Sequence, residues 1–390
     1  MSNTTNPQGL VLGIDATNIR FGGGVTHLTE LLKNVEIDRY GINHVVVWGC
    51  EETLNNLPNH SQIKKISIGS VTTGYIRRVL WQRLFLSRAV RQEKCDVLFV
   101  PGGNYVGNFS PIVTMSRNML PFQTKELSRY FFSWIWLRLL ILRQLQSYSF
   151  RRASGMIFLT EYASRAVQQI AGKLLGQTTV IAHGLSHRFA RLPKPQMPID
   201  SYSIDKPFRL IYVSIIDLYK HQWSVVQAVD LLRKEGFPLT LELIGPSYPA
   251  ALRRLQAAIG AAGGQGNWVR VVGNVPHDKL SEHYGAADLG IFASSCENMP
   301  NILLETMAAG LPVVCSNKGP MPEVLGDSGL YFDPENPHEI ATAIRQYLNS
   351  PDLRASKAEA SYQRARQYSW ADCAHKTFGF LVQIARKRMS

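Results

Sequence analysis

The chain has 390 residues, a hydrophobic fraction of 45% and a formal net charge of +13. This length is enough for two domains with a core each, and the ordinary hydrophobic fraction excludes a largely disordered chain. No run of about 18 apolar residues exists, which excludes a membrane-spanning helix. The polar start, MSNTTNPQGL, lacks the apolar core of a signal peptide.

The cysteines predict a reducing compartment. They are odd in number, scattered and without metal-ligand spacing: Cys50, Cys95, Cys296, Cys315 and Cys373. Such thiols are typical of cytosolic proteins. We therefore expect a cytoplasmic protein.

The positive charge is concentrated in the first half of the chain. Residues 74–152 contain thirteen Lys or Arg against three Asp or Glu. This local excess predicts an anionic partner. No nucleic-acid recognition module is present in the sequence, so we do not expect nucleic acid to be that partner.

The first half predicts strands that alternate with helices, a pattern typical of a parallel sheet with helices on both faces. The expected strands are Leu10–Asp15, Asn43–Gly49, Lys65–Ile68, Asp96–Val100, Ile112–Met115, Met156–Leu159 and Thr179–Ala182. After the first strand, a loop ends in Gly22-Gly23-Gly24, and a helix is expected over Val25–Val35. Glycines between a strand and a helix let the backbone approach a ligand closely. These three glycines are contiguous, so they do not have the spacing of the dinucleotide-binding motif.

Two helical segments carry most of the positive charge. In Gly74–Arg91, residues Ile76, Leu80, Leu84 and Ala89 lie on or near one face. Leu127–Arg152 is richer in Trp, Phe and Leu. Two interpretations stay open. A basic helix with aromatic residues suits the surface of an anionic membrane, which makes segments 75–91 and 127–152 candidate membrane contacts. Alternatively, their apolar faces are core and the arginines form the solvated edge.

The second half repeats the alternating pattern. Leu192–Pro207 is proline-rich and polar, which predicts a linker. The expected strands are Arg209–Ser214, Leu239–Gly245, Val269–Gly273, Asp288–Ala293 and Leu311–Cys315. One helix is expected to begin at Gln222. Three further helices are expected over Ile340–Leu348, Ser356–Tyr368 and Trp370–Lys387. Gly245 and Gly273 end their strands at the carboxyl edge of the sheet, where open α/β sheets bind ligands.

The stretch Ala287–Pro334 contains the strongest functional signal. A polar loop, Ser294–Met299, leads into a helix expected over Pro300–Ala309, with Pro in the first turn and Gly310 after the end. The first N–H groups of this helix, near Asn301 and Ile302, form a site suited to a diphosphate. Glu297 and Glu305 flank that site. Carboxylates repel phosphates, so we expect them to accept hydrogen bonds from sugar hydroxyls. A structural alternative is that Glu297 caps the helix and Glu305 is exposed.

The wider pattern resembles the retaining family 4 glycosyltransferases, also called glycosyl transferases group 1. The resemblance rests on two glutamates separated by seven residues together with several elements at fixed spacing. These elements are Pro300, Met307-Ala308-Ala309-Gly310, Pro312-Val313-Val314, Pro322-Glu323-Val324, Gly329, and, upstream, Gly273-Asn274-Val275, Leu280 and Asp288. It covers most of the second half of the chain. Ala182-His183-Gly184 resembles the turn that ends the family's first domain.

The resemblance implies a donor site for a UDP- or GDP-linked sugar. Lys220 would neutralise the donor diphosphate, Glu297 would hold the sugar hydroxyls, and Glu305 would hold the ribose. The nucleotide base would lie against backbone at Gly273 to Val275. Further donor-binding positions are Gly23, Gly24, Ser214, Asn298, Met299, Pro300, Asn301 and Ile302.

The chain departs from the family pattern at three positions. The family's Arg before Lys220 is replaced by Ile215, and the Gly after it is replaced by His221. His221 or an arginine of the first domain are candidates to replace the missing charge. The acceptor-side His is absent after Ile112–Met115, where Arg117 or Asn118 is a candidate for a polar positioning role. We assign that role to Asn118, with Glu297 and Lys220 as the other catalytic residues; alternatively the segment only shapes the acceptor pocket.

No Asp-x-Asp pair occurs, so no metal and no cofactor beyond the donor substrate are expected. Lys220 and helix N-terminal amides must then meet the charge of the leaving group.

The resemblance implies the GT-B fold, with two Rossmann-like doubly wound parallel-sheet domains facing a cleft. We expect an acceptor-binding domain over residues 1–195, a donor-binding domain over 205–365, and a helix over 366–390 that returns to the first domain. The expected function is retaining transfer of a hexose to a glycan or lipid-linked acceptor in bacterial polysaccharide or lipopolysaccharide synthesis, at the inner face of the cytoplasmic membrane. The alternatives are a nucleotide-sugar epimerase and a catalytically inactive relative that acts as a binding protein.

Overall fold

The computed structural model describes residues 9–20, 22–69, 74–263 and 268–389. The polar start and the Ile76 side chain, both used above, lie outside the described part. The chain forms two compact units. The first contains the described residues up to Leu127, together with Phe131–Gly184 and the stretch from Ser369 onward. The second contains Ser128–Tyr130 and Leu185–Tyr368.

The first unit is built on a seven-stranded parallel sheet of order β3-β2-β1-β4-β5-β6-β7. Its strands are β1 (Leu10–Asp15), β2 (Ile42–Gly49), β3 (Ile63–Ser67), β4 (Val97–Val100), β5 (Ile112–Met115), β6 (Gly155–Phe158) and β7 (Gln177–Val180). The residues of β1, β4, β5 and β6 are buried throughout, because helices cover both faces of the sheet. All seven predicted strands are confirmed, with ends that differ by up to two residues.

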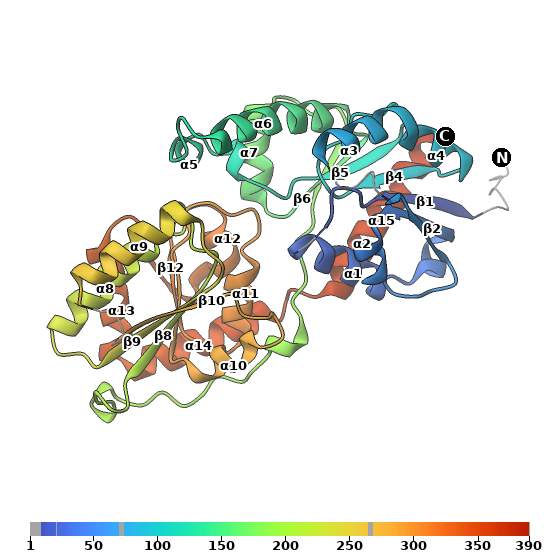
Figure 1. Cartoon of the computed structure of the whole chain (residues 1–390). Helices are drawn as coiled ribbons and strands as arrows, with labels where there is room; N and C mark the ends of the chain where they lie inside the picture. The colour runs from blue at the N-terminus through green and yellow to red at the C-terminus, as the bar shows by residue number, and fades with distance from the viewer. Residues whose placement is uncertain (1–8, 21, 70–73, 264–267, 390) are drawn as a thin grey trace. The chain divides into compact units, whose positions relative to one another are not determined.

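The helices of the first unit include one contributed by the far end of the chain. They are α1 (Gly23–Asn34), α2 (Glu51–Asn55), α3 (Tyr75–Trp81), α4 (Ser87–Gln92), α5 (Thr124–Ser128), α6 (Trp134–Arg152), α7 (Glu161–Ala171) and α15 (Trp370–Met389). A π-helical turn, Gln82–Leu86, joins α3 to α4. Helix α15 packs on α1 (Figure 1).

Two helix predictions are wrong in detail. Gly23 and Gly24 form the first turn of α1 and are not part of the loop. Leu127–Arg152 is not one helix: α5 ends at Ser128, Phe132 has a φ of 58°, and Ser133 caps α6 by accepting a hydrogen bond from the Trp136 N–H. A positive φ is incompatible with a continuous right-handed helix, so the aromatic run is split into a turn and a helix.

The second unit contains a six-stranded parallel sheet of order β10-β9-β8-β11-β12-β13. Its strands are β8 (Phe208–Val213), β9 (Leu239–Ile244), β10 (Val269–Gly273), β11 (Leu289–Phe292), β12 (Val313–Ser316) and β13 (Leu330–Phe332). The strand order reverses direction after β10. Right-handed crossovers therefore place helices on opposite faces before and after β10.

The helices that join the strands of the second unit follow that rule, and two further helices come after the last strand. They are α8 (Gln222–Lys234), α9 (Pro249–Ala261), α10 (Leu280–Ala286), α11 (Asn301–Ala308), α12 (Met321–Leu325), α13 (Pro337–Asn349) and α14 (Pro351–Ala365). Helix α8 packs against α9 and α13, whereas α11 packs against α12 and α14 (Figure 1). The reversal creates a point at the carboxyl edge, beside β8 and β11, where sheets of this kind bind ligands.

No described helix is long and apolar enough to cross a membrane.

Candidate active site

At the carboxyl edge of the second sheet, the ends of β8, β9 and β10 lie close together because glycines allow their backbones to touch. Ser214 follows β8, and a Cβ on Gly245, which follows β9, would lie 2.2 Å from the Ser214 carbonyl oxygen, so only glycine fits there. The Gly245 N–H donates to the Gly273 carbonyl at 2.8 Å. Gly273 has a φ of 81° and no neighbouring atom where its Cβ would stand. Its backbone is therefore open to a ligand.

Lys220 is buried behind this edge and is held from both ends. Its backbone carbonyl accepts a 2.8 Å hydrogen bond from the Tyr212 hydroxyl. Its ammonium forms an ion pair with the Glu297 carboxylate and lies 5.1 Å and 5.5 Å from the ring centroids of Tyr219 and Phe292. The two residues assigned to the diphosphate and to the sugar therefore contact each other in the free protein. Glu297 is not a helix cap.

His221 stands where the family pattern has Gly, and its backbone keeps a conformation typical of glycine. It precedes α8 with a φ of 52°, a conformation that glycine adopts at little cost. Its Nε2 lies 2.9 Å from the Ser295 hydroxyl. Burial lowers the pKa of His221 to about 4, so its imidazole is neutral at pH 7. His221 therefore does not replace the positive charge missing at Ile215, which is itself half-exposed.

Glu305 lies inside α11 and is only 7% exposed, so it is not a solvent-facing helix residue. One carboxylate oxygen, Oε1, lies 2.9 Å from His277 Nε2. The other, Oε2, is buried and has no hydrogen-bond partner among the described residues. A buried carboxylate oxygen normally has a donor, so this oxygen is suited to a ligand hydroxyl. His277 was not predicted, because a single His in a polar loop carries no recognisable pattern.

Helix α11 begins next to these residues with its N-terminus uncapped by any side chain. Pro300 is the N-cap instead of the predicted first helical residue, and the first turn contains no acidic residue. Asn298 and Met299, which lead into it, are buried, while Asn301 and Ile302 are partly exposed in its first turn. An eight-residue helix with this N-terminus suits an anion. The second unit thus gathers Lys220, Glu297, Glu305, the start of α11 and the open Gly273 end, with Val275 two residues beyond.

The remaining predicted residues lie in the first unit. Asn118 is exposed, and its Oδ1 accepts a 3.1 Å hydrogen bond from the Leu120 N–H, so part of this side chain serves the local turn. Gly23 has open space where its Cβ would stand, and a Cβ on Gly24 would lie 2.8 Å from Arg117 Nη1. The role of each of these residues stays a prediction.

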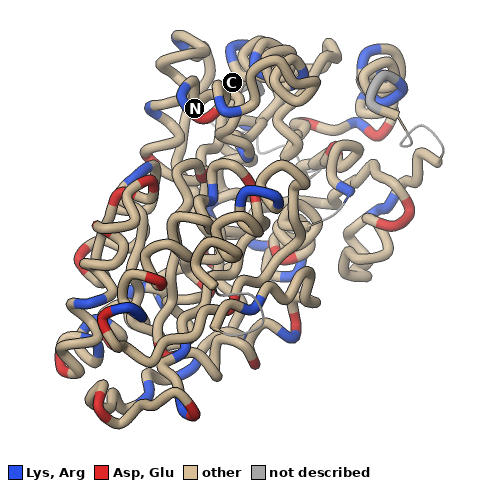
Figure 2. The backbone as a smooth tube through the Cα atoms, turned by 60° about the vertical axis from the view of Figure 1, so that its left-hand side comes forward, with Lys and Arg blue, Asp and Glu red and all other residues tan. Residues whose placement is uncertain are grey.

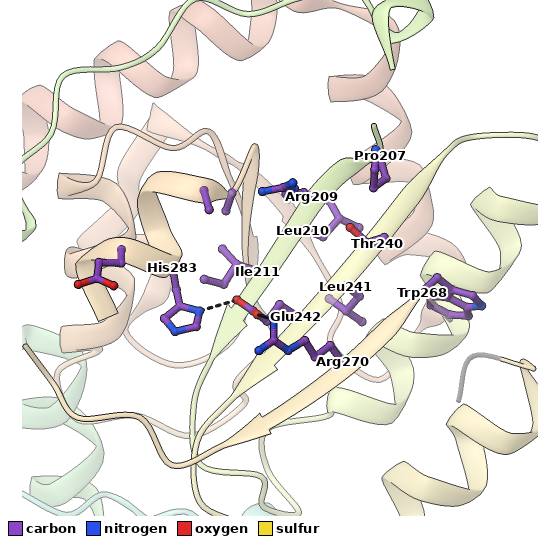
Figure 3. A pocket seen from close by; sticks show the side chains of 13 residues that line it. Pro207, Arg209, Leu210, Ile211, Thr240, Leu241, Glu242, Trp268, Arg270 and His283 are labelled. Carbon is purple, nitrogen blue, oxygen red and sulfur yellow. Dashed lines mark hydrogen bonds and ion pairs between the residues drawn. The ribbon is translucent and has the colours of Figure 1, made fainter. Parts of the chain in front are cut away.

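A pocket of about 540 Å³ lies away from all of these residues, at the amino-terminal halves of β8, β9 and β10 (Figure 3). Glu242 on β9 crosses its floor, with a carboxylate oxygen 2.8 Å from His283 Nδ1 and the other 3.5 Å from Arg270 Nη1. Glu242 thus contacts both His283 and Arg270. The pocket is therefore a partly covered sheet face at the end of the strands opposite the ligand-binding edge.

Among the described residues, no group of three or more His, Cys, Asp or Glu side chains is arranged to hold a metal ion. The five cysteines are free and buried.

The two sheets, their strand orders and the site at the carboxyl edge define a GT-B protein. Solved structures are similar over nearly the whole chain at low identity. HepE of Anabaena, solved in complex with UDP, has a TM-score of 0.67 and 18% identity, covering 96% of this chain and all of that one. WaaG, a glycosyltransferase involved in lipopolysaccharide biosynthesis, has a TM-score of 0.66 and 15% identity, covering 95% and 99%.

The family follows from sequence. Residues 196–364, which form most of the second unit, match the model of glycosyl transferases group 1, and this part of the chain belongs to that family. It is 29% identical over 192 residues to O-antigen chain mannosyltransferase B of Escherichia coli, covering 47% of this chain and 49% of the relative. It is 32% identical over 137 residues to a D-inositol 3-phosphate glycosyltransferase of Nocardioides, covering 34% and 30%. The matched segments thus span about half or less of these relatives.

Proposed function

We propose that the protein is a retaining glycosyltransferase that moves a hexose from a UDP- or GDP-linked donor to a glycan or lipid-linked acceptor of the bacterial cell surface. The second unit binds the donor and the first unit binds the acceptor. The observation that carries the proposal is the half-satisfied Glu305 carboxylate beside an uncapped helix start. A ribose hydroxyl of the donor would donate a hydrogen bond to the Glu305 oxygen that has no partner. The donor diphosphate would accept hydrogen bonds from the free N–H groups at the start of α11.

The proposed reaction uses the chain's own charges. Lys220 exchanges Glu297 for the donor diphosphate, and this exchange frees the Glu297 carboxylate to accept hydrogen bonds from the sugar. The leaving diphosphate departs while the acceptor hydroxyl attacks the anomeric carbon from the same face and gives its proton to the leaving oxygen. Lys220 and the α11 amides stabilise the negative charge that develops on the diphosphate.

The test is sugar transfer from a panel of UDP- and GDP-linked hexoses, with lipid extracts of bacterial membranes as acceptor. We expect one donor to lose its sugar to the extract with release of the nucleoside diphosphate. Lys220→Ala should lower transfer by about 10²–10³, and the matched exposed control Lys234→Ala should not. Nucleotide binding without transfer or release would favour the inactive relative, and interconversion of donor sugars without transfer would favour the epimerase.

The membrane part of the proposal is supported by an apolar stripe on the solvent side of α6. Trp134, Leu137, Ile141 and Tyr148 recur at helical spacing and are 43–75% exposed, and Phe132, just before the helix, is fully exposed. The core-facing residues of α6, such as Leu139 and Phe150, form a separate stripe. The alternative, that the apolar face of this segment is core and its arginines form the solvated edge, does not account for these exposed apolar side chains.

The other basic segment shows the same combination. Leu80, Leu84 and Phe85, on α3 and the π-helical turn, are 49–61% exposed, whereas Leu86 and Val90 enter the core. Figure 2 marks the Lys and Arg positions of both segments in blue. Exposed apolar side chains interspersed with arginines match an anionic bilayer better than a protein partner, because they combine insertion with attraction to lipid phosphates. We therefore propose peripheral binding at the inner face of the cytoplasmic membrane.

Vesicle flotation tests this membrane contact. The protein should float with vesicles that contain anionic phosphatidylglycerol and not with zwitterionic phosphatidylcholine vesicles. The double variant Trp134→Ser/Leu137→Ser should reduce the floated fraction several-fold. Leu175→Ser is the matched control, because Leu175 is 82% exposed outside both segments. Equal flotation of all variants, or none with anionic vesicles, would contradict the proposal.

A further inference from the structure

The Glu305 carboxylate of α11 has one oxygen that is held and one that is open. Oε1 lies 2.9 Å from His277 Nε2, and among the described residues His277 is the one partner of this carboxylate. Oε2 is buried and has no hydrogen-bond partner there. The side chain of Glu305 is only 9% exposed. A buried acceptor without a donor costs free energy, so Oε2 calls for a hydroxyl of a ligand.

The His277 ring is supported by two buried aromatic rings. It follows β10 in the segment beyond Gly273, and its own side chain is 43% exposed. The imidazole meets Phe189 edge-on, with 5.0 Å between the ring centroids. Phe189 is 1% exposed and contacts the fully buried ring of Tyr284 at 6.0 Å. The imidazole is therefore backed by packed side chains while its Nε2 faces Glu305.

The turn that contains Phe189 is attached to α11 itself. The 3₁₀ turn His187–Phe189 packs against this helix. Just beyond it, the Arg191 N–H donates a 2.9 Å hydrogen bond to the Ala308 carbonyl at the end of α11. A Cβ on Gly310 would lie 2.7 Å from the Arg191 carbonyl oxygen, so glycine permits this contact. The support of the imidazole is thus fixed to the same helix that carries the carboxylate.

A fixed Oε1 determines the direction of Oε2. The terminal torsion of a Glu side chain is soft, so a carboxylate without partners can tilt its plane or exchange its two oxygens. Because a carboxylate only accepts hydrogen bonds, Nε2 of His277 carries a proton and donates it to Oε1, and this bond fixes the plane. A fixed, buried acceptor favours a ligand that supplies the missing hydroxyl. It disfavours an analogue without that hydroxyl, because the acceptor then stays unpaired.

We propose that His277 is a positioning residue of the donor site, which holds Oε1 of Glu305 and thereby directs Oε2 at a hydroxyl of the donor ribose. The pair selects ribonucleoside diphosphate sugars against donors that lack a ribose hydroxyl. His277 acts through Glu305 and takes no part in the transfer step. This inference rests on the proposed function, in which Glu305 binds the ribose.

The test measures nucleotide binding to the full chain by titration calorimetry. The probes are the nucleoside diphosphate that wild type prefers, UDP or GDP, and its dideoxyribose analogue, which lacks both ribose hydroxyls. Wild type should bind the ribose form at least about tenfold more tightly than the analogue. His277→Phe keeps a ring against Phe189 and loses the donor to Glu305, so this ratio should fall to about threefold or less. His277→Gln, whose amide N–H replaces that donor, should restore most of the ratio.

The control is His338→Phe, at an exposed histidine of the same unit, which should keep the wild-type ratio. Transfer kinetics give a second readout. His277→Phe should raise KM for the donor and leave kcat nearly unchanged, because a ribose hydrogen bond is made alike in the ground state and the transition state. Circular dichroism of each variant excludes misfolding as the cause of a loss.

Two results would contradict the inference in distinguishable ways. An unchanged ratio in His277→Phe, whether or not both affinities fall, would show a purely structural role for His277 and overturn the inference alone. Absence of nucleotide binding to wild type would refute the proposed function, and this inference with it.

Discussion

Lys220 in the second unit is buried and Arg117 in the first is partly exposed. Each lies next to a buried neutral histidine, His221 and His27 respectively, but the two cations differ in their partners. Lys220 is paired with Glu297, while Arg117 has no carboxylate partner among the described residues. A paired cation must exchange its partner when a ligand arrives, whereas an unpaired one gains a partner. The comparison teaches that the buried cation is paired with a carboxylate, whereas the partly exposed cation keeps access to solvent.

The largest expected effect concerns Lys220. Lys220→Ala removes the cation that meets the leaving diphosphate, so kcat/KM for transfer should fall by about 10²–10³. Steady-state kinetics with the preferred donor measures this fall, and Lys234→Ala should keep wild-type values. A loss of tenfold or less would mean that the α11 amides are sufficient to stabilise the negative charge of the leaving diphosphate.

The buried histidines predict acid sensitivity. The pKa of His221 is about 4 in the folded protein against about 6.5 when unfolded, so the unfolded chain takes up a proton first as the pH falls. Stability is therefore complete above pH 6.5 and is lost between pH 6.5 and 4, by about 2–3 kcal/mol at pH 4.5. His27 acts in the same direction.

Urea unfolding of wild type and His221→Asn at pH 7.5 and 4.5 measures this loss. Asn tolerates the positive φ of this position, and the variant should lose less stability on acidification. His338→Asn, at an exposed histidine, is the control. Identical pH dependence in all three proteins would contradict the neutral buried state of His221.

The ion pair of Lys220 should appear as coupling between two variants. Lys220→Ala leaves the Glu297 carboxylate largely buried without a cation, and Glu297→Gln removes that charge. Because both side chains keep some solvent contact, the coupling energy should be roughly 1–2 kcal/mol, below that of a fully buried pair. Urea unfolding of the two single variants and the double variant gives this energy. Additive effects would show that the pair is not formed in solution.

Arg117 should behave in the opposite way, with the smallest effect. Arg117→Met replaces a partly exposed charge that has no carboxylate partner with an apolar side chain of similar length, so the free energy of unfolding should rise by no more than about 1 kcal/mol. Urea unfolding of wild type and variant measures this change. Destabilisation of Arg117→Met would mean that Arg117 has a structural partner.

The sequence predicted most of the fold because buried parallel strands are short apolar runs that end at turn residues, as in Leu10–Asp15 and Val269–Gly273. It failed where tertiary contacts decide. The three-residue strand β13 is too short for any pattern, and the turn at Phe132 breaks a segment whose composition favours a helix. The residues of the proposed site came from spacing and resemblance. Their partners did not: neither the Lys220–Glu297 contact nor His277 beside Glu305 can be read from spacing, because each joins side chains far apart in the chain.

The most direct test of the donor site is a thermal-shift screen of UDP, GDP and their common sugar conjugates on wild type, Glu305→Ala and the exposed control Glu359→Ala. A ligand at about 100 times its dissociation constant stabilises by roughly 2.7 kcal/mol, which moves the midpoint of a chain this size by a few degrees. We predict a shift with one nucleotide in wild type and control, and a much smaller one in Glu305→Ala. No shift with any nucleotide, or an equal shift in Glu305→Ala, would contradict the proposed site.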